Sequence, residues 1–258
     1  MKKFGLKTIL LAFGIFSAIN IFAQEHKIAM SSGKLIINEV NKVEIEGYSG
    51  SEVIFSTTSH SRKRSERAAG LKAINSLGLE DNTGIGLSVN KKGGNMEVSS
   101  ISRNSSTRYN IKVPKSVTIV YEHSSHHGSK LSIKNVESEI EISTNFNSVY
   151  LENVTGPMTI NTVHGKIEAI FSTVSQKSPI TMASAHGLID VAIAEATKAD
   201  LKLSSSWGEI FTDMNIDLEV AGDMKNIATS NVKGKLNGGG VKIDLRSTHN
   251  NIYLRKKK

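Results

Sequence analysis

A repeat of about 20 residues, which begins near Ser124, constrains the fold more than any other feature of this sequence. Glycine or asparagine recurs along it at intervals of 19, 18, 22, 21 and 42 residues. These positions are Gly128, Asn147, Gly165, Gly187, Gly208 and Asn250. Because glycine and asparagine tolerate positive φ angles best, the repeat predicts a sharp corner at each of them. The last interval is long enough to hold two further repeats.

Two more columns keep a fixed distance from the corners. Small hydroxyl residues stand three positions before them, at Ser125, Thr144, Thr162, Ser184, Ser205 and Ser247. A hydroxyl at that position can hydrogen-bond the backbone of the turn. Aliphatic residues stand two positions after the corners, at Val149, Ile167, Ile189, Ile210 and Ile252, with the first repeat displaced by one residue to Leu131. Each repeat therefore predicts a strand, a corner, a second strand and a second corner.

The length of the repeat indicates the fold class, because a unit of about 20 residues cannot bury its own apolar face and must stack on its neighbours. Short alternating runs such as 109–113 and 117–120 predict strands, whereas amphipathic helical periodicity is almost absent. We predict an all-β, single-domain β-solenoid of the β-helix-like type, with equivalent residues about 4.8 Å apart on parallel strands. The alternative is an antiparallel β-sandwich, which does not require the same residue type at every corner.

The N-terminus has the pattern of a secretory signal peptide over residues 1–23. Three lysines precede an apolar run at 9–21, and small residues lead to Ala23. We expect cleavage after Ala23, which leaves residues 24–258 as the mature domain; an uncleaved anchor is the alternative, although the apolar run is shorter than the roughly 20 residues of a membrane span. The chain has no cysteine, so it can carry neither a cysteine-linked lipid anchor nor a disulfide. The expected location is the periplasm or the cell surface.

Residues 59–83 predict a basic excursion between strands, which is part helical at best because Gly70 weakens its apolar face. The cations of this basic loop are Arg62, Lys63, Arg64 and Arg67. Without the three signal lysines the chain has 29 basic and 24 acidic residues, a net charge of +5. Clusters of this kind are usually solvated. Nucleic acid is not expected as a partner without interleaved aromatic residues, which leaves a glycan, another polyanion of the cell envelope or a protein.

One residue before each corner stands a histidine or an aromatic residue. This column consists of His127, Phe146, His164, His186, Trp207 and His249. In a solenoid the six side chains are predicted to form one ladder along a surface edge, where they could contact a partner. His164 and His186 are the only consecutive histidines of the column in chain order, and imidazole is a common ligand of transition metals. No carboxylate or cysteine recurs beside them to complete a site, so the favoured interpretation is an exposed stack without metal or cofactor.

Several segments of the chain carry a family resemblance. Residues 43–50 (VEIEGYSG), 109–114 (YNIKVP) and 250–255 (NNIYLR), together with the repeated Ser/Thr-x-x-Gly-x-Ile corners, stand in the order found in a known family. The chain resembles the "putative adhesin" domains of unknown function in exported bacterial proteins, which are akin to head-GIN domains. The resemblance covers nearly all of residues 24–258 and implies a single-domain β-solenoid in the periplasm or at the cell surface. It implies no catalytic residues.

Catalysis is not indicated by the distribution of acidic residues. Glu137, Glu139 and Glu141 alternate along one predicted strand, whereas the other acidic residues follow their corners at differing offsets. Acid and base catalysis on polysaccharides needs paired carboxylates in a groove, and no Gly-x-Ser-x-Gly motif is present. We expect a non-enzymatic, adhesin-like interaction module. The alternatives are a carbohydrate-active β-helix enzyme and a structural assembly element whose terminal coils pair with another chain.

Overall fold

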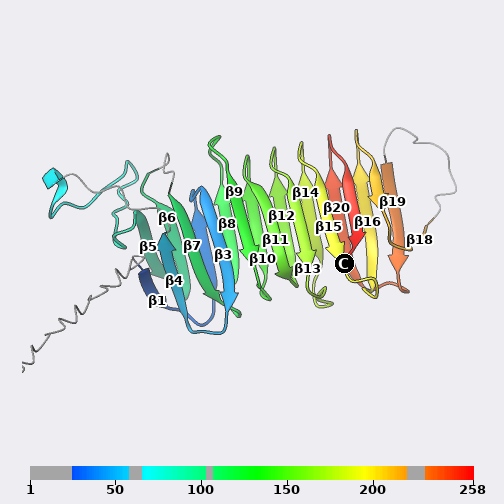
Figure 1. Ribbon diagram of the computed structural model, residues 1–258, viewed down its shortest axis with the longest axis horizontal. Coiled ribbons are helices and arrows are strands. Elements are labelled where there is room, and N and C mark those ends of the chain that lie inside the picture. Colours follow the sequence, from blue (N-terminus) through cyan, green and yellow to red (C-terminus); the bar gives the residue numbers. More distant parts are fainter. Residues whose placement is uncertain (1–24, 58–65, 103–106, 220–229) are drawn as a thin grey trace, which may run out of the picture.

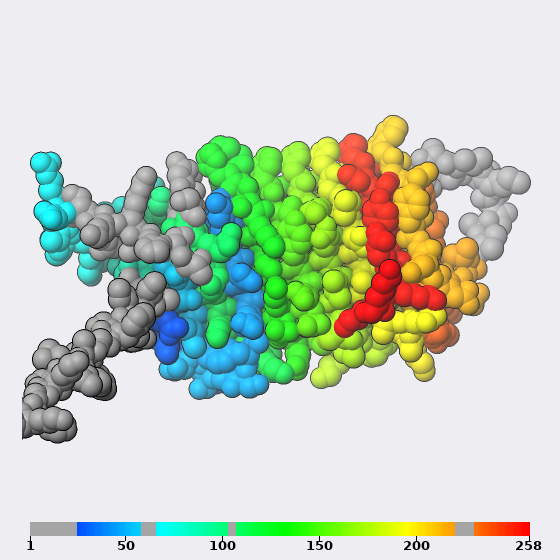
Figure 2. Space-filling view, in the orientation of Figure 1, coloured from blue at the N-terminus to red at the C-terminus, as the bar shows by residue number. Residues whose placement is uncertain are grey.

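The computed structural model describes residues 25–57, 66–102, 107–219 and 230–258, and these form two long β-sheets that face each other (Figure 1). The first sheet contains, in spatial order, β1 (Glu25–Ala29), β4 (Glu52–Thr57), β7 (Arg108–Pro114), β3 (Lys42–Tyr48), β9 (Lys130–Lys134), β11 (Ser148–Val154), β13 (Ile167–Phe171), β15 (Ile189–Ile193), β21 (Ile252–Lys256) and β17 (Ile210–Thr212). The second contains β18 (Asp217–Leu218), β19 (Ser230–Leu236), β16 (Ala199–Ser205), β20 (Val241–Ser247), β14 (Ile180–Ser184), β12 (Met158–Thr162), β10 (Ile140–Thr144), β8 (Thr118–His123), β2 (Lys34–Asn38), β6 (Asn95–Ser100) and β5 (Leu87–Lys92). The result is an elongated body (Figure 2).

Each coil contributes one strand to each sheet, and the strands of successive coils are parallel and in register. In β10 and β12, for example, Ile140 lies opposite Met158 and Ile142 lies opposite Ile160. This arrangement confirms the all-β solenoid and excludes the antiparallel sandwich, in which neighbouring strands of each sheet would run in opposite directions.

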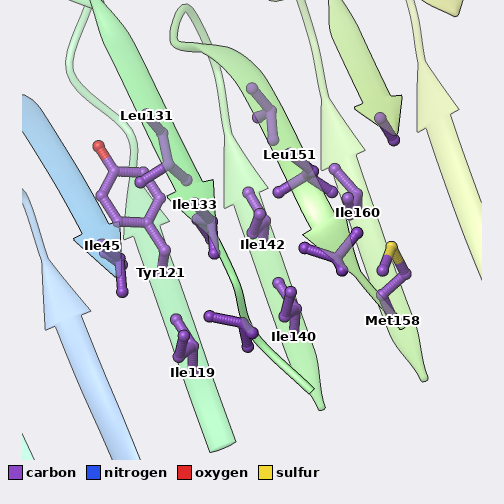
Figure 3. Close-up of a cluster of buried hydrophobic side chains, with 14 of the residues drawn as sticks. Ile45, Ile119, Tyr121, Leu131, Ile133, Ile140, Ile142, Leu151, Met158 and Ile160 are labelled. Carbon is purple, nitrogen blue, oxygen red and sulfur yellow. The ribbon is translucent and has the colours of Figure 1, made fainter. Parts of the chain in front are cut away.

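The core is built from the inward residues of both sheets, which stack in rows along the length of the solenoid (Figure 3). Ile119, Ile140 and Met158 form one such row and are almost completely buried. Full burial of a side chain of this size contributes about 1.5–3 kcal/mol. Tyr121 is the largest buried side chain, and its hydroxyl donates a hydrogen bond of 2.7 Å to the carbonyl oxygen of Val40. The rows hold the coils together because no single coil encloses its own core.

The order of the coils in space differs from their order in the chain. The N-terminal coil, β2–β3, lies between the coils β6–β7 and β8–β9. The C-terminal coil, β20–β21, lies between β14–β15 and β16–β17, so the C-terminus is found within the row of strands (Figure 1). The interval between Gly208 and Asn250 therefore does not hold two further repeats in line. It holds β18 and β19, which are antiparallel to their neighbours, and the strand β20 that returns into the stack.

The predicted corners are limited by the close approach of adjacent coils and not by the expected positive φ. None of the six predicted corner residues has a positive φ; instead Asn135, Asn153 and Asn237, at the second set of corners, have φ angles of 57°, 54° and 52°. Four residues of the first set are glycines, and at each of them a Cβ atom would come within 2.3 Å of the adjacent coil. A Cβ atom on Gly187 would lie 2.0 Å from the carbonyl oxygen of Gly165, which no real contact allows.

The hydroxyl column confirms its predicted role and adds a second one. The Ser184 hydroxyl accepts a hydrogen bond of 2.8 Å from the backbone N–H of Gly187, three residues on. It also lies 3.2 Å from the carbonyl oxygen of Gly165 in the preceding coil, to which it donates. Ser205 and Ser247 form the same pair of contacts. The column therefore fixes each corner and also joins it to the next coil.

β1, β5 and β18, at three of the four sheet edges, are antiparallel to their neighbours, whereas β17, at the fourth edge, is parallel to β21. The predicted excursion contains little regular structure. Its described part has one short 3-10 helix, η1 (Glu66–Ala68), while Leu71, Ile74 and Leu77 are exposed and do not pack as a helical face. Of the basic loop, Arg67 lies in η1, and Arg62, Lys63 and Arg64 lie outside the described residues, as does the signal peptide at 1–23. No helix within the described ranges has the length and apolarity needed to cross a membrane.

Candidate functional site

Four members of the predicted ladder stack on one another at the corners. The ring centroids of Phe146 and His164 are 4.6 Å apart, those of His164 and His186 are 4.8 Å apart, and those of His186 and His249 are 4.5 Å apart. Interplanar angles of 21°, 7° and 15° show that the rings are nearly parallel. We call these four residues the ring ladder.

His249 corrects the expectation that His164 and His186 are the only adjacent histidines. The insertion of β20–β21 beside β14–β15 brings His249 next to His186, although 63 residues separate them in the chain. Sequence order alone would place Trp207 there. The ring ladder therefore contains three consecutive imidazoles.

Backbone hydrogen bonds between the corners set the spacing of the ring ladder. The N–H of His164 donates to the carbonyl oxygen of Asn145 at 2.7 Å, and that of His186 donates to Val163 at 2.8 Å. The N–H of His249 donates to Ala185 at 3.0 Å. The Nδ1 atom of His249 also lies 3.0 Å from this carbonyl oxygen, which can only accept a hydrogen bond, so Nδ1 is the donor in this contact. The ladder is thus held by the corners themselves and needs no further ordering.

The other two members of the column lie outside the stack. The backbone N–H of Trp207 donates to Thr248 at 2.9 Å, which places it one coil beyond His249, but its side chain is 79% exposed and stacks on no ring in the described part of the chain. His127 instead contacts His126, with ring centroids 3.9 Å apart. The structure therefore brings four of the six predicted edge residues into one ladder.

The stacking of His164 and His186 does not present a shared metal site. The lone pair of an imidazole nitrogen lies in the ring plane, and two rings inclined by 7° have no common point within the bond length of about 2.1 Å that zinc requires. Among the described residues, no group of three or more histidine, cysteine or acidic side chains is placed to hold a metal ion.

A polar network beside the N-terminal coil was not predicted from the sequence. Glu39, at the corner between β2 and β3, accepts hydrogen bonds from the backbone N–H of Ser124 at 2.8 Å and from its hydroxyl at 2.5 Å. Burial opposes ionisation of Glu39, but these hydrogen bonds outweigh it and hold its pKa below the usual range. Burial lowers the pKa of nearby His123, although the charge of Glu39 acts against this shift. Glu39 has a positive φ of 53°, and the sequence gives no indication of this conformation.

A carboxylate pair was also missed. Glu168 and Asp190 are register partners on β13 and β15, and each stands three residues after its corner, a regularity that could have revealed them. Lys166 binds Glu168 at 2.6 Å, and Arg255 binds both oxygens of Asp190 at 2.8 and 2.9 Å. Each carboxylate therefore has its own cation: Glu168 is paired with a residue of its own segment and Asp190 with a residue of the neighbouring strand β21.

Comparison with known proteins gives only distant similarities. No family model and no curated protein matches the chain. Among solved structures, the chain is similar to a "putative cell adhesion protein" from Clostridium sporogenes, with 14% sequence identity, coverage of 91% of this chain and 100% of that chain, and a TM-score of 0.45. It is also similar to a "putative adhesin" from Bacteroides fragilis, with 9% identity, coverage of 90% and 96%, and a TM-score of 0.30. These similarities are too loose to assign the chain a function.

Proposed function

We propose that the protein is an exported, non-enzymatic, adhesin-like module that binds a glycan or protein partner along the ring ladder, in the periplasm or at the cell surface. The observation that carries this proposal is the stack of Phe146, His164, His186 and His249 on one surface edge. Phe146 is 40% exposed and the three imidazoles are exposed as well. A row of planar rings in this position is accessible to a partner.

The chemistry of the ring ladder suits binding. Aromatic rings supply apolar contact area with few rotatable bonds, and each imidazole adds a hydrogen-bond donor and an acceptor at its edge. Because the ladder is already ordered by its corners, a partner would not have to immobilise it, which lowers the cost of association.

The carboxylates support the non-enzymatic part of the proposal. Glu168 and Asp190 are the register-paired acidic residues on the outer face of the first sheet, and both are held by cations. Hydrolysis of polysaccharides uses two carboxyl groups that face each other across a groove, whereas each of these is bonded to a cation of its own. Incubation with acidic polysaccharides is therefore expected to release no reducing ends and no unsaturated sugars; release of either would favour the β-helix enzyme.

The test of the ring ladder compares two variants of residues 24–258. The histidine variant combines His164→Ala, His186→Ala and His249→Ala. The control variant combines Ser143→Ala and Asn161→Ala, at residues that lie on β10 and β12 and are exposed on the outer face of the second sheet. Binding to intact bacterial cells and to a glycan array is measured for both.

We expect the histidine variant to bind at least about tenfold more weakly, because it removes a central cluster of contacts, and the control to bind as the unchanged protein does. Circular dichroism and thermal unfolding establish that the variants are folded. Equal binding by the histidine variant and the unchanged protein would refute the ladder as the contact surface.

A further inference from the structure

The outer face of the first sheet carries a row of cations that the sequence does not reveal. Lys42 on β3 is the register partner of Arg108 on β7. Val43 pairs with Leu131, so the preceding residues, Lys42 and Lys130, are adjacent as well. The three cations thus occupy neighbouring strands, which lie about 4.8 Å apart. Like charges placed opposite each other destabilise a sheet, so packing does not account for this row.

A hollow of about 310 Å³ lies beside these cations. It is lined by Lys42, Val43, Glu44, Arg108, Ser129, Lys130 and Ser132. Ser132 is 6% exposed and has a longer neighbour on each side in the sheet, Glu44 on β3 and Tyr150 on β11. Its small side chain therefore leaves a depression with a hydroxyl at the base and cations around it. We call this hollow the basic groove.

Two cations of the basic groove, Lys42 and Lys130, have no ion-pair partner among the described residues. The ammonium group of Lys130 lies 4.5 Å from the centre of the Tyr150 ring, which stabilises it without using its charge in an ion pair. Arg108 and Lys130 are exposed.

One acidic residue, Glu44, also lines the groove. Because three cations, Lys42, Arg108 and Lys130, line it as well, the groove keeps an excess of positive charge.

We propose that the basic groove binds the carboxylate or sulfate groups of a linear acidic polysaccharide that lies along the axis of the solenoid. Arg108, Lys42 and Lys130 follow one another along this axis, so they fit successive positions on a chain. Arginine and lysine bind such anions through charge-assisted hydrogen bonds, and Ser129 and Ser132 can bond sugar hydroxyls.

Two neighbouring residues extend the same surface. Lys166 continues the row on β13, two strands from β9 and so about 9.6 Å away. Tyr150 lies between them on β11, with the ammonium groups of Lys130 and Lys166 4.5 and 5.1 Å from its ring centre. An aromatic ring beside a row of cations suits a sugar polymer, whose rings have apolar faces and whose substituents are anionic. No large exposed apolar residue lines the groove, which disfavours a membrane surface.

The groove lies on a sheet face and shares no residue with the ring ladder, so the inference goes beyond the proposed function. The experiment measures binding of residues 24–258 to polygalacturonate and to dextran sulfate by isothermal titration calorimetry, with neutral dextran as the uncharged probe. The groove variant carries Lys42→Gln, Arg108→Gln and Lys130→Gln. A matched variant removes the same charge elsewhere on the exposed surface, through Lys177→Gln, Lys198→Gln and Lys242→Gln.

We expect the unchanged protein and the matched variant to bind at least one of the two acidic polymers but not neutral dextran, with an affinity that falls as NaCl is added. The groove variant should bind at least about tenfold more weakly. The histidine variant of the ring ladder should bind as the unchanged protein does, which separates this inference from the proposed function.

Three results would overturn the inference. They are an equal loss in the matched variant, binding to neutral dextran as tight as to the acidic polymers, and binding to phosphatidylglycerol vesicles in the absence of binding to either polymer. If the triple variant fails to fold by circular dichroism, the single variant Lys42→Gln replaces it, because Lys42 has no ion-pair partner among the described residues to lose. An affinity unchanged in that variant would equally count against the groove.

Discussion

The last two coils of the stack carry the same corner motif in different surroundings. The inner coil, β20–β21, has Ser247, His249, Asn250 and Ile252, and the outer coil, β16–β17, has Ser205, Trp207, Gly208 and Ile210. Ile252 is completely buried, whereas Ile210 is partly buried and the next residue, Phe211, is 44% exposed. The motif therefore specifies the shape of a coil, but it does not specify where the coil lies in the stack.

The apolar content of the strands explains the different positions. The inner coil buries five aliphatic side chains: Val241, Ile243, Leu245, Ile252 and Leu254. Such a coil is stable only with a neighbour on each side. The outer coil has a three-residue strand in the first sheet, β17, and its other strand is covered by the antiparallel β19. A coil with a weaker apolar face can thus occupy the end, where one side meets the solvent.

The largest expected effect contrasts the two coils directly. Ile252→Ala should lower the free energy of unfolding by about 2–5 kcal/mol, because it leaves a cavity between two coils. Ile210→Ala should cost about 1 kcal/mol, since this side chain is partly buried and has a neighbouring coil on one side. Urea denaturation of residues 24–258 measures both values. Equal losses would show that the end of the stack is packed as tightly as its interior.

A second prediction compares two glycines whose substitution by alanine lowers the stability for different physical reasons. Gly187→Ala should cost up to about 3 kcal/mol, because its Cβ would meet the carbonyl oxygen of Gly165 at 2.0 Å and the coils would have to separate. Gly238→Ala, in the turn before β20, should cost about 1 kcal/mol, because no atom lies within 4 Å and only its φ of +83° is unfavourable. The same denaturation measurement ranks them, and the reverse order would contradict the close approach of the corners.

The sequence predicted those features that each coil determines locally. The hydroxyl and corner columns could be identified because Ser184 and Gly187 are three residues apart and contact each other in the turn. The position of the glycines was also correct, although the reason was steric contact with the next coil. A repeat predicts such contacts only if the identity of the neighbouring coil is known.

The remaining features depend on the order of the coils, which the repeat does not encode. His249 joins the ring ladder because β20–β21 returns between earlier coils. Likewise, Arg108, Lys42 and Lys130 come together because β2–β3 lies between β6–β7 and β8–β9. Equivalent strands share one hydrophobic pattern, so any coil could pair with any other by periodicity alone. Their order depends on the total burial of the stack and on the antiparallel strands at its ends.

The two inserted coils also differ in how they are held, and this difference leads to the prediction with the smallest effect. The C-terminal coil is held by stacked rings and hydroxyl contacts, whereas the N-terminal coil is anchored by Glu39, which accepts two hydrogen bonds from Ser124 beside the buried His123. Burial lowers the pKa of His123 in the folded protein below its unfolded value of about 6.5. The unfolded chain therefore binds a proton more readily than the folded one. Above about pH 6.5 His123 is neutral in the unfolded chain and does not affect the free energy of unfolding. Below that value the unfolded chain binds a proton, and the free energy of unfolding falls as the pH drops.

The measurement follows the urea midpoint of residues 24–258 between pH 8 and pH 5, compared with that of His123→Gln, which keeps a polar side chain but cannot be protonated. We expect the slope of stability against pH below about 6.5 to be smaller in the variant, because one proton-binding difference has been removed. The histidine variant of the ring ladder serves as the control, since it leaves His123 in place and should retain the contribution of that residue. The same slope in His123→Gln and in the unchanged protein would mean that His123, on β8 beside the N-terminal coil, does not cause the pH dependence. Glu39, whose pKa is lowered, affects stability in a separate window: its contribution is present above the unfolded value and is lost as the pH falls through the folded value, below the range of this measurement.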